Sequence, residues 1–147
     1  MNTISQRIHY TVEQVPQVAQ QLLELSKKFP IFAISGTLGA GKTTLVQEML
    51  GKLGIEGVLT SPTFTYVNIY HAHSKTIYHF DLYRIKSVQE FLVAGFDEYI
   101  FDHSTISLIE WPEVIEPLLT QNVCFVTIDY GSENNSRIIT INCKGRE

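Results

Sequence analysis

The stretch Gly36-Thr-Leu-Gly-Ala-Gly-Lys-Thr43 decides the fold, because it matches the phosphate-binding pattern G-x-x-x-x-G-K-[ST]. Its glycines let the backbone curl so that successive amides point at phosphate oxygens. The Lys42 ammonium is placed to reach the outer phosphates, and the Thr43 hydroxyl to ligate Mg²⁺. The stretch therefore predicts a nucleotide site. Its expected phosphate-binding residues are Gly36, Thr37, Leu38, Gly39, Ala40, Gly41, Lys42, Thr43 and Thr44.

The sequence on both sides of this loop agrees with that interpretation. The apolar run Ile31–Ile34 predicts a buried strand that enters the loop. From Lys42 to about Leu53 the apolar residues fall on one face of a helix, and Gly54 suits a left-handed stop. The start of this helix adds its partial positive charge to the phosphate site.

Strands and helices alternate along the rest of the chain. A helix is predicted from Thr11 to about Lys28, where Thr11 and Gln14 form a capping box. Pro16 lies slightly too deep for a first-turn proline, so the start stays open between Thr11 and Pro16. Strands are expected over 63–70, 76–82, 105–109, 123–129 and 137–142, and helices over 87–101 (broken at Gly95) and from Pro112. This predicts one α/β domain over residues 1–147, with a mixed central sheet flanked by helices.

Composition excludes several classes of protein. The 15 acidic and 11 basic residues give a net charge of −4, which argues against broad non-specific nucleic-acid binding. No apolar run approaches the roughly 18–20 residues of a membrane-spanning helix. Cys124 and Cys143 lack CxxC spacing, so neither a zinc site nor a disulfide framework is expected. We expect a soluble, cytoplasmic protein.

A nucleotide-hydrolysing site needs a second acidic group at the end of a neighbouring buried strand. Glu110 ends the run Ile106–Ile109, in a position that resembles a Walker B acid with Glu in place of Asp. Asp81, in HFDLYR (79–84), is the other candidate. The alternatives are a solvated strand-end Glu110 and a loop or cap carboxylate at Asp81.

Three further features leave alternatives open. The hydroxyls of Thr60, Ser61 and Thr63 around a proline suit either a phosphate-sensing switch or an ordinary turn. The histidines 71, 73 and 79 lack a correctly spaced third ligand, which disfavours a metal site. Arg84 and Arg137 suit phosphate or adenine contacts, although isolated arginines usually lie on the surface.

Four segments together resemble the TsaE (YjeE) family. They are GTLGAGKTT (36–44), LTSPTFTYVNIY (59–70), YHFDLYRI (78–85) and IEWPE (109–113), and the similarity extends from Thr11 to Arg137. This family comprises bacterial ATPases required for the threonylcarbamoyladenosine modification of tRNA. The resemblance implies a P-loop NTPase-like fold that binds Mg²⁺-ATP or ADP. It also implies action with the TsaD–TsaB pair, which modifies the adenosine at position 37 of tRNAs that read ANN codons, and which ATP hydrolysis resets between turnovers.

The resemblance also implies roles for individual residues. Lys42 and Thr43 match the phosphate and Mg²⁺ residues, Glu110 the second Mg²⁺ ligand, and Asp81 a position close to metal and water. Thr11 and Arg137 match positions near the nucleotide, and Thr60, Ser61 and Thr63 the switch-like segment. One position departs from the family, whose loop usually reads GDLGAGKTT where this chain has Thr37. Nucleotide binding is expected to survive this change, whereas the hydrolysis rate or the dependence on partners is in doubt.

Other functions compete with an ATPase. A small-molecule kinase shares the loop but usually needs an arginine-rich lid, and no segment of this chain carries several arginines. A GTPase is weakly supported because NKxD and DxxG are both missing. A non-catalytic subunit that changes shape on binding nucleotide is the third alternative, and Thr37 gives it weight. Because no arginine finger or general base is evident, we expect slow turnover without partners, and tRNA contact only through them.

Overall fold

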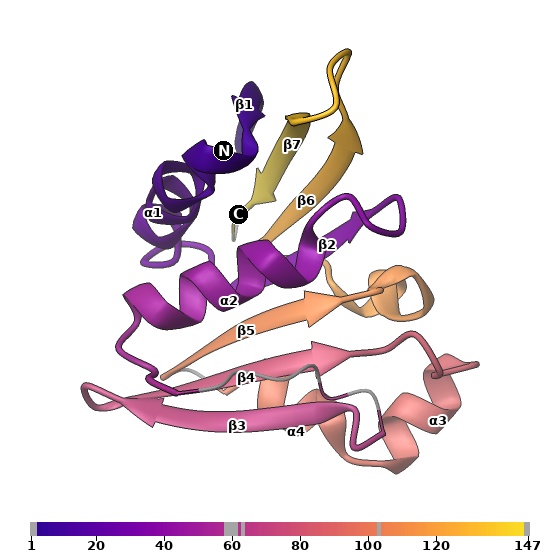
Figure 1. Cartoon of the computed structure of the whole chain (residues 1–147). Helices are drawn as coiled ribbons and strands as arrows, with labels where there is room; N and C mark the ends of the chain where they lie inside the picture. Colours follow the sequence, from indigo (N-terminus) through magenta and orange to yellow (C-terminus); the bar gives the residue numbers. More distant parts are fainter. Residues whose placement is uncertain (1–2, 58–61, 63, 103, 146–147) are drawn as a thin grey trace.

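A mixed seven-stranded sheet organises the part of the chain that the computed structural model describes, residues 3–57, 62, 64–102 and 104–145. The strand order is β1-β7-β6-β2-β5-β4-β3 (Figure 1). The strands β6, β2, β5 and β4 run parallel, whereas β7, β1 and β3 pair antiparallel with their neighbours. Their bounds are β1 (Thr3–Thr11), β2 (Ile31–Gly36), β3 (Val67–Ala72), β4 (Lys75–Asp81), β5 (Thr105–Glu110), β6 (Val123–Tyr130) and β7 (Ser136–Lys144). The expected α/β fold with a mixed sheet is confirmed.

Helices cover both faces of the sheet, as the continuous apolar runs of its central strands require. On one face lie α1 (Val15–Leu25) and α2 (Lys42–Lys52), which pack into one hydrophobic cluster with the sheet. Figure 1 shows α2 lying in front of β2, with β5 below it in that view. The other face carries a second cluster with α3 (Val88–Val93), α4 (Phe96–Ile100) and the 3-10 helix η2 (Glu113–Leu118). Leu45, Val46 and Met49 of α2 are fully buried, which fixes the helix after the loop against the sheet.

The N-terminal region corrects the sequence prediction. Thr11 ends strand β1 instead of opening a helix; a 3-10 turn (Val12–Gln14) follows, and α1 begins at Val15 with Pro16 in its first turn. The capping interaction is present, since the Thr11 amide donates to Oε1 of Gln14 at 2.9 Å. Strand β1 was not predicted, although its apolar residues Ile4, Ile8 and Tyr10 all fall on one face of a strand. Pairing with β7 along its whole length supplies the stabilisation that a lone edge segment lacks.

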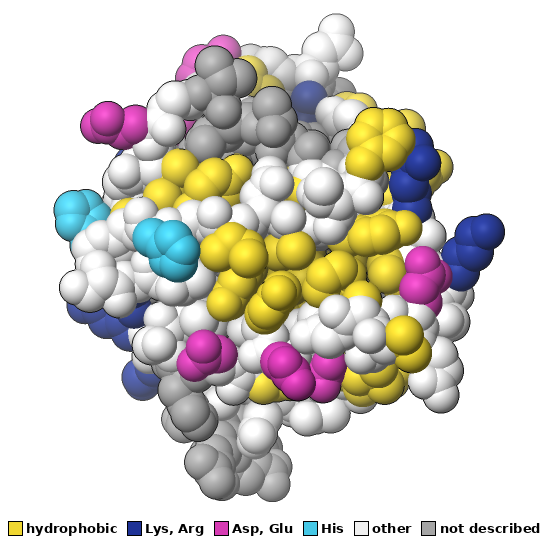
Figure 2. Space-filling model, turned by 90° about the horizontal axis from the view of Figure 1, so that it is seen from below, with side chains coloured by type: hydrophobic (Ala, Val, Ile, Leu, Met, Phe, Trp, Pro, Cys, Tyr) yellow, Lys and Arg dark blue, Asp and Glu magenta, His cyan; other side chains and the backbone are white. Residues whose placement is uncertain are grey.

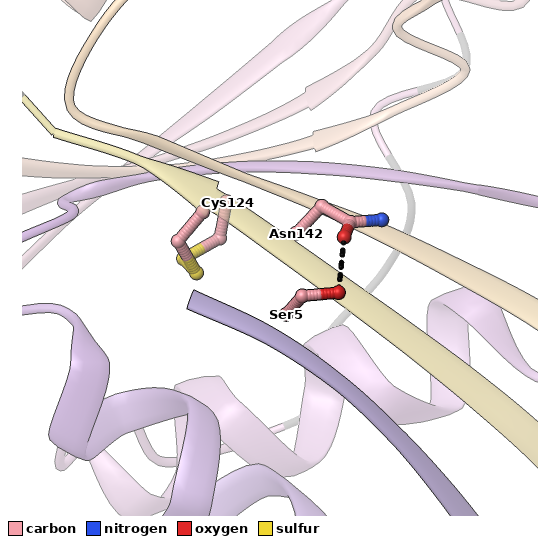
Figure 3. Close-up of a disulfide and its surroundings, with 4 residues drawn as sticks. Ser5, Cys124 and Asn142 are labelled. Carbon is pink, nitrogen blue, oxygen red and sulfur yellow. Dashed lines mark hydrogen bonds between the residues drawn. A yellow bond between two sulfur atoms is a disulfide. The ribbon is translucent and has the colours of Figure 1, made fainter. Parts of the chain in front are cut away.

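The two cysteines form a disulfide, so the expectation of none is wrong. Cys124 of β6 and Cys143 of β7 lie opposite each other in the antiparallel register, and a bond joins their sulfur atoms. Figure 3 shows this crosslink beside the hydrogen bond from Ser5 of β1 to Asn142 of β7, which is 2.9 Å long. Sequence spacing missed the pair because the hairpin register, which sets the two residues side by side, is a long-range property.

The remaining elements lie close to their predicted places. Strand β3 begins at Val67, later than expected, and the hairpin turn to β4 consists of His73 and Ser74, both with positive φ. Gly95, at φ 80°, separates α3 from α4 where the helix break was predicted. Strand β5 extends one residue beyond its predicted end to include Glu110. The expected helix from Pro112 is the 3-10 helix η2.

The edge of the sheet at β3 presents apolar side chains. Figure 2 views the molecule from below Figure 1, onto this edge, and hydrophobic side chains gather at its centre. Ile69 of β3 is 47% exposed, and Tyr66 and Val67 are partly buried against the second cluster. In the described part of the chain, none of the helices has the length and apolar character needed to cross a bilayer.

Candidate functional site: a phosphate-binding loop beside a buried carboxylate

The loop between β2 and α2 has the backbone that the motif predicts. Gly36, Gly39 and Gly41 have φ values of 143°, 82° and 108°, which L side chains rarely adopt. A Cβ atom on Gly36 would lie 2.2 Å from the carbonyl oxygen of Ile128 in β6. The loop therefore leaves the sheet in a backbone conformation that favours glycine. It leads directly into the first turn of α2.

A pocket of about 360 Å³ lies over this loop, at the carboxyl ends of the parallel strands. Ligands of open α/β sheets bind at this edge. Loop and helix residues form one wall, and residues at the ends of β4 and β5 and directly after them form the other. The lining residues are Leu38, Gly39, Gly41, Lys42, Thr43, Thr44, Asp81, Tyr83, Glu110 and Trp111.

Lys42 is the cation of the pocket and is only 5% exposed. Its ammonium donates to the carbonyl oxygens of Gly36 at 2.7 Å and Thr37 at 3.4 Å, and it lies 4.0 Å from the centre of the Trp111 ring. Burial lowers the pKa of Lys42 below its usual value, and the nearby carboxylates, first that of Glu110, oppose this shift. An anionic ligand in the pocket would raise the pKa of Lys42 again.

Glu110, the last residue of β5, connects the loop to the sheet. Its Oε1 accepts a hydrogen bond of 2.7 Å from the Thr43 hydroxyl, and its Oε2 lies 2.6 Å from Nε2 of His79 in β4. The Glu110 side chain is 2% exposed, so the alternative of a solvated strand-end carboxylate does not hold. A hydroxyl and a carboxylate at this distance are the oxygen donors that Mg²⁺ prefers, so these residues fit the expected ion.

Asp81 lies directly opposite Glu110 in the parallel register of β4 and β5 and also lines the pocket. Its Oδ1 accepts a hydrogen bond of 3.1 Å from the Tyr83 amide, as a capping carboxylate does. The two expected acids therefore stand side by side at one edge of the sheet. Asp81 therefore acts as a capping carboxylate, which was the predicted alternative, and also lines the pocket.

Arg137 and Thr11 lie on the opposite side of the loop from Glu110. The Arg137 guanidinium donates to the Ala40 carbonyl at 3.2 Å and lies 4.7 Å from the centre of the Tyr130 ring. Thr11 pairs with Ser136, next to Arg137, at the end of β1. Arg137 thus contacts the phosphate loop directly, whereas Thr11 lies at the end of β1 and does not line the pocket.

Other predicted residues lie elsewhere. The Arg84 guanidinium lies 4.7 Å from the centre of the Phe64 ring, outside the pocket. Nδ1 of His71 and the Thr76 hydroxyl are 3.3 Å apart at the β3–β4 hairpin. Thr60, Ser61 and Thr63, the expected switch-like segment, lie outside the described residues. Within the described part of the chain, His, Cys, Asp and Glu side chains form no group of three or more that suits a metal ion.

Sequence reasoning missed Tyr83 and Trp111 as residues of this site, and it considered His79 only as a disfavoured metal ligand. Each lies in a motif that also holds a predicted residue, HFDLYR or IEWPE. A usable signal was the period of two along a strand, which puts His79 on the same face of β4 as Asp81. The Trp111 ring, by contrast, reaches Lys42 through a backbone with φ 56°, which spacing does not reveal.

The fold and the site define a nucleotide-binding protein of the P-loop class, with the loop after β2 and acidic residues at the ends of β4 and β5. The family model described as "Threonylcarbamoyl adenosine biosynthesis protein TsaE" matches residues 9–139. The chain therefore belongs to the TsaE family, as the sequence motifs predicted.

Individual relatives agree with this assignment. The chain is 42% identical to the tRNA threonylcarbamoyladenosine biosynthesis protein TsaE of Haemophilus influenzae, over 76% of this chain and 71% of the relative. It is 32% identical to the protein of that name from Bacillus subtilis, over 86% and 78% of the two chains. The crystal structure of Bacillus subtilis YdiB shares the fold, with a TM-score of 0.72 at 24% identity over 99% of this chain and 89% of that one.

Proposed function

We propose that the protein binds and hydrolyses Mg²⁺-ATP in the threonylcarbamoyladenosine modification of tRNA. The observation that carries this proposal is the hydrogen bond of 2.7 Å between Thr43 of the loop and Glu110 of β5. It puts a hydroxyl and a carboxylate together beside Lys42, in the pocket over a loop with the phosphate-binding sequence. The pocket would thereby bring the phosphates of ATP, the metal ion and the attacking water together.

The residues of the pocket divide the work of phosphoryl transfer. Lys42 and the loop amides would bind the β- and γ-phosphates and stabilise the charge that develops during in-line attack by water. Thr43 and Glu110 would hold Mg²⁺, which would supply further positive charge to stabilise the transferring phosphoryl group. Asp81, beside Glu110 in the sheet, would orient water next to the ion. Arg137 would brace the loop through the Ala40 carbonyl.

The family assignment supports a place for this activity in tRNA modification. We propose that the chain acts with the TsaD–TsaB pair in the cytoplasm and that hydrolysis resets the pair between turnovers. Contact with tRNA would pass through that complex, because the net charge of −4 disfavours phosphate backbone binding by this chain alone.

The Glu110→Ala variant tests the assignment of the metal site. We expect the variant to keep its affinity for ATP in EDTA, because the loop amides and Lys42 are unchanged, and to lose the Mg²⁺-dependent gain in affinity and turnover. The single tryptophan, Trp111, lines the pocket, so its fluorescence reports binding. A folded variant with wild-type Mg²⁺ dependence would remove Glu110 from the mechanism.

A nucleotide-gated subunit without turnover is the second candidate. Thr37, at the position where the family usually has Asp, favours it. In the structure the Thr37 carbonyl accepts from the Ala40 amide at 3.0 Å and from Lys42, while its side chain is exposed. Because these contacts involve the backbone, a missing carboxylate at this position would leave the shape of the loop unchanged.

A further inference from the structure

His79 is a buried imidazole at the border between the apolar layer under α2 and the polar pocket, with Leu108 of β5 on one side and Asn68 of β3 on the other. It lies on the face of β4 that meets α2, beside Ile77 and opposite Leu108 of β5, and is 1% exposed. Its Nδ1 has no hydrogen-bond partner among the described residues. A buried polar side chain that leaves part of its hydrogen-bonding capacity unused is unfavourable for folding. Packing alone therefore does not account for a histidine at this position.

The hydrogen bond that His79 does make is to Glu110. Nε2 of the imidazole lies 2.6 Å from Oε2 of the carboxylate, and a carboxylate accepts, so Nε2 donates. The other oxygen, Oε1, accepts from Thr43 on the pocket side. His79 therefore fixes one oxygen of Glu110 from beneath the site, while the other faces the loop.

From this geometry we infer that His79 is a positioning residue that sets the Glu110 carboxylate for Mg²⁺ bound with ATP. The inference rests on the proposed function, since it concerns the ion expected between Thr43 and Glu110. A glutamate side chain has several rotatable bonds. A partner that fixes one of its oxygens reduces the number of side-chain conformations before the ion binds. Partners behind metal ligands typically change metal affinity by about 10–100-fold when they are lost.

The test compares two amides at one position. The amide nitrogen of Gln reaches the place of Nε2, whereas that of the shorter Asn corresponds to Nδ1. We expect the affinity of H79Q for the divalent cation to stay close to that of the wild type. The affinity of H79N should be weaker by about 10–100-fold. Mn²⁺ is the probe, with a non-hydrolysable ATP analogue, and electron paramagnetic resonance measures the free ion.

Controls separate positioning from folding. S107A removes a buried hydroxyl on the other face of the sheet, where Ser107 lies opposite Tyr78, and should leave Mn²⁺ affinity unchanged. Thermal melting checks the fold of each variant. Affinity for the nucleotide in EDTA should be the same in all of them, because His79 has no place in the loop.

Several outcomes would overturn the inference. A folded H79N with wild-type Mn²⁺ affinity would do so, as would equal loss in H79Q and H79N. In the unmodified protein, the nuclear magnetic resonance signal of the His79 ring should shift when Mg²⁺ is added to the analogue complex, and an unchanged signal would also contradict it. Failure of the wild-type protein to bind Mn²⁺ with nucleotide would overturn the proposed function itself, and the inference with it.

Discussion

Gly36 is the residue on which the geometry of the phosphate loop depends most. It is the last residue of β2 and pairs with Ile128 of β6, whose carbonyl lies where a Cβ would stand. The G36A variant should lose about 1–3 kcal/mol of unfolding free energy, because the backbone of β6 cannot yield as a flexible side chain can. Chemical denaturation measures the loss.

Gly51 supplies the matched control for that variant. It lies exposed in α2, where a Cβ atom would have no neighbour within 4 Å, and its backbone is helical rather than left-handed. G51A should therefore stabilise the protein by about 0.5–1 kcal/mol. Equal effects of the two substitutions would show that close packing against β6 does not set the requirement at Gly36.

Individual residues of the site differ in how far the sequence foretold them. Lys42 and Thr43 follow from a motif with fixed spacing, so their place in the pocket was predictable. Glu110 was predictable as a strand end, but its burial was not, because burial depends on both neighbouring strands. The contact of Trp111 with Lys42 depends on a left-handed residue and a long-range approach, neither of which leaves a pattern in the sequence.

At the scale of elements, local signals predicted β2, α2, β4 and β5, whose apolar runs and turn residues lie within short windows. Strand β1 escaped prediction because its stabilisation comes from pairing with β7, more than a hundred residues away in the chain. The same long-range pairing in the β6–β7 hairpin brings the two cysteines together. Elements defined by distant partners are those that local periodicity does not find.

The crosslink between β6 and β7 gives a prediction about stability. Reduction of the disulfide between Cys124 and Cys143, which are 19 residues apart, should lower the free energy of unfolding by about 3 kcal/mol. The reason is that the bond limits the conformations of the unfolded chain. Denaturant unfolding with and without dithiothreitol measures the difference, and the double variant C124A/C143A should not respond to the reductant. If the protein denatured without reductant has two free thiols, the crosslink does not form.

On the scale of the whole molecule, the parallel strands at the centre of the sheet and the antiparallel strands on both sides of them have different roles. The carboxyl ends of the parallel strands carry the loop, Glu110 and Asp81, so a ligand in the pocket would lie against the loop, α2 and the ends of β4 and β5. The antiparallel additions on both sides extend the sheet and, through Arg137, brace the loop from β7. The edge at β3 carries the apolar surface of Figure 2.

This arrangement explains why we expect slow turnover from the chain alone. In the described residues, the pocket wall contributes one buried cation, Lys42, and Arg84 points to Phe64 instead. Transition states of phosphoryl transfer generally need additional positive charge, often from a partner. We therefore expect another protein to supply the missing positive charge.

Phosphate release from ATP is the measurement that tests the central claim most directly. It should be followed with and without Mg²⁺, for the chain alone and with the TsaD–TsaB pair, beside the K42A variant. We predict slow Mg²⁺-dependent release that the pair accelerates and that K42A abolishes. Tight binding of ATP with no release under either condition would contradict an ATPase and leave a nucleotide-gated binding subunit, with Thr37 as the first residue to restore to Asp.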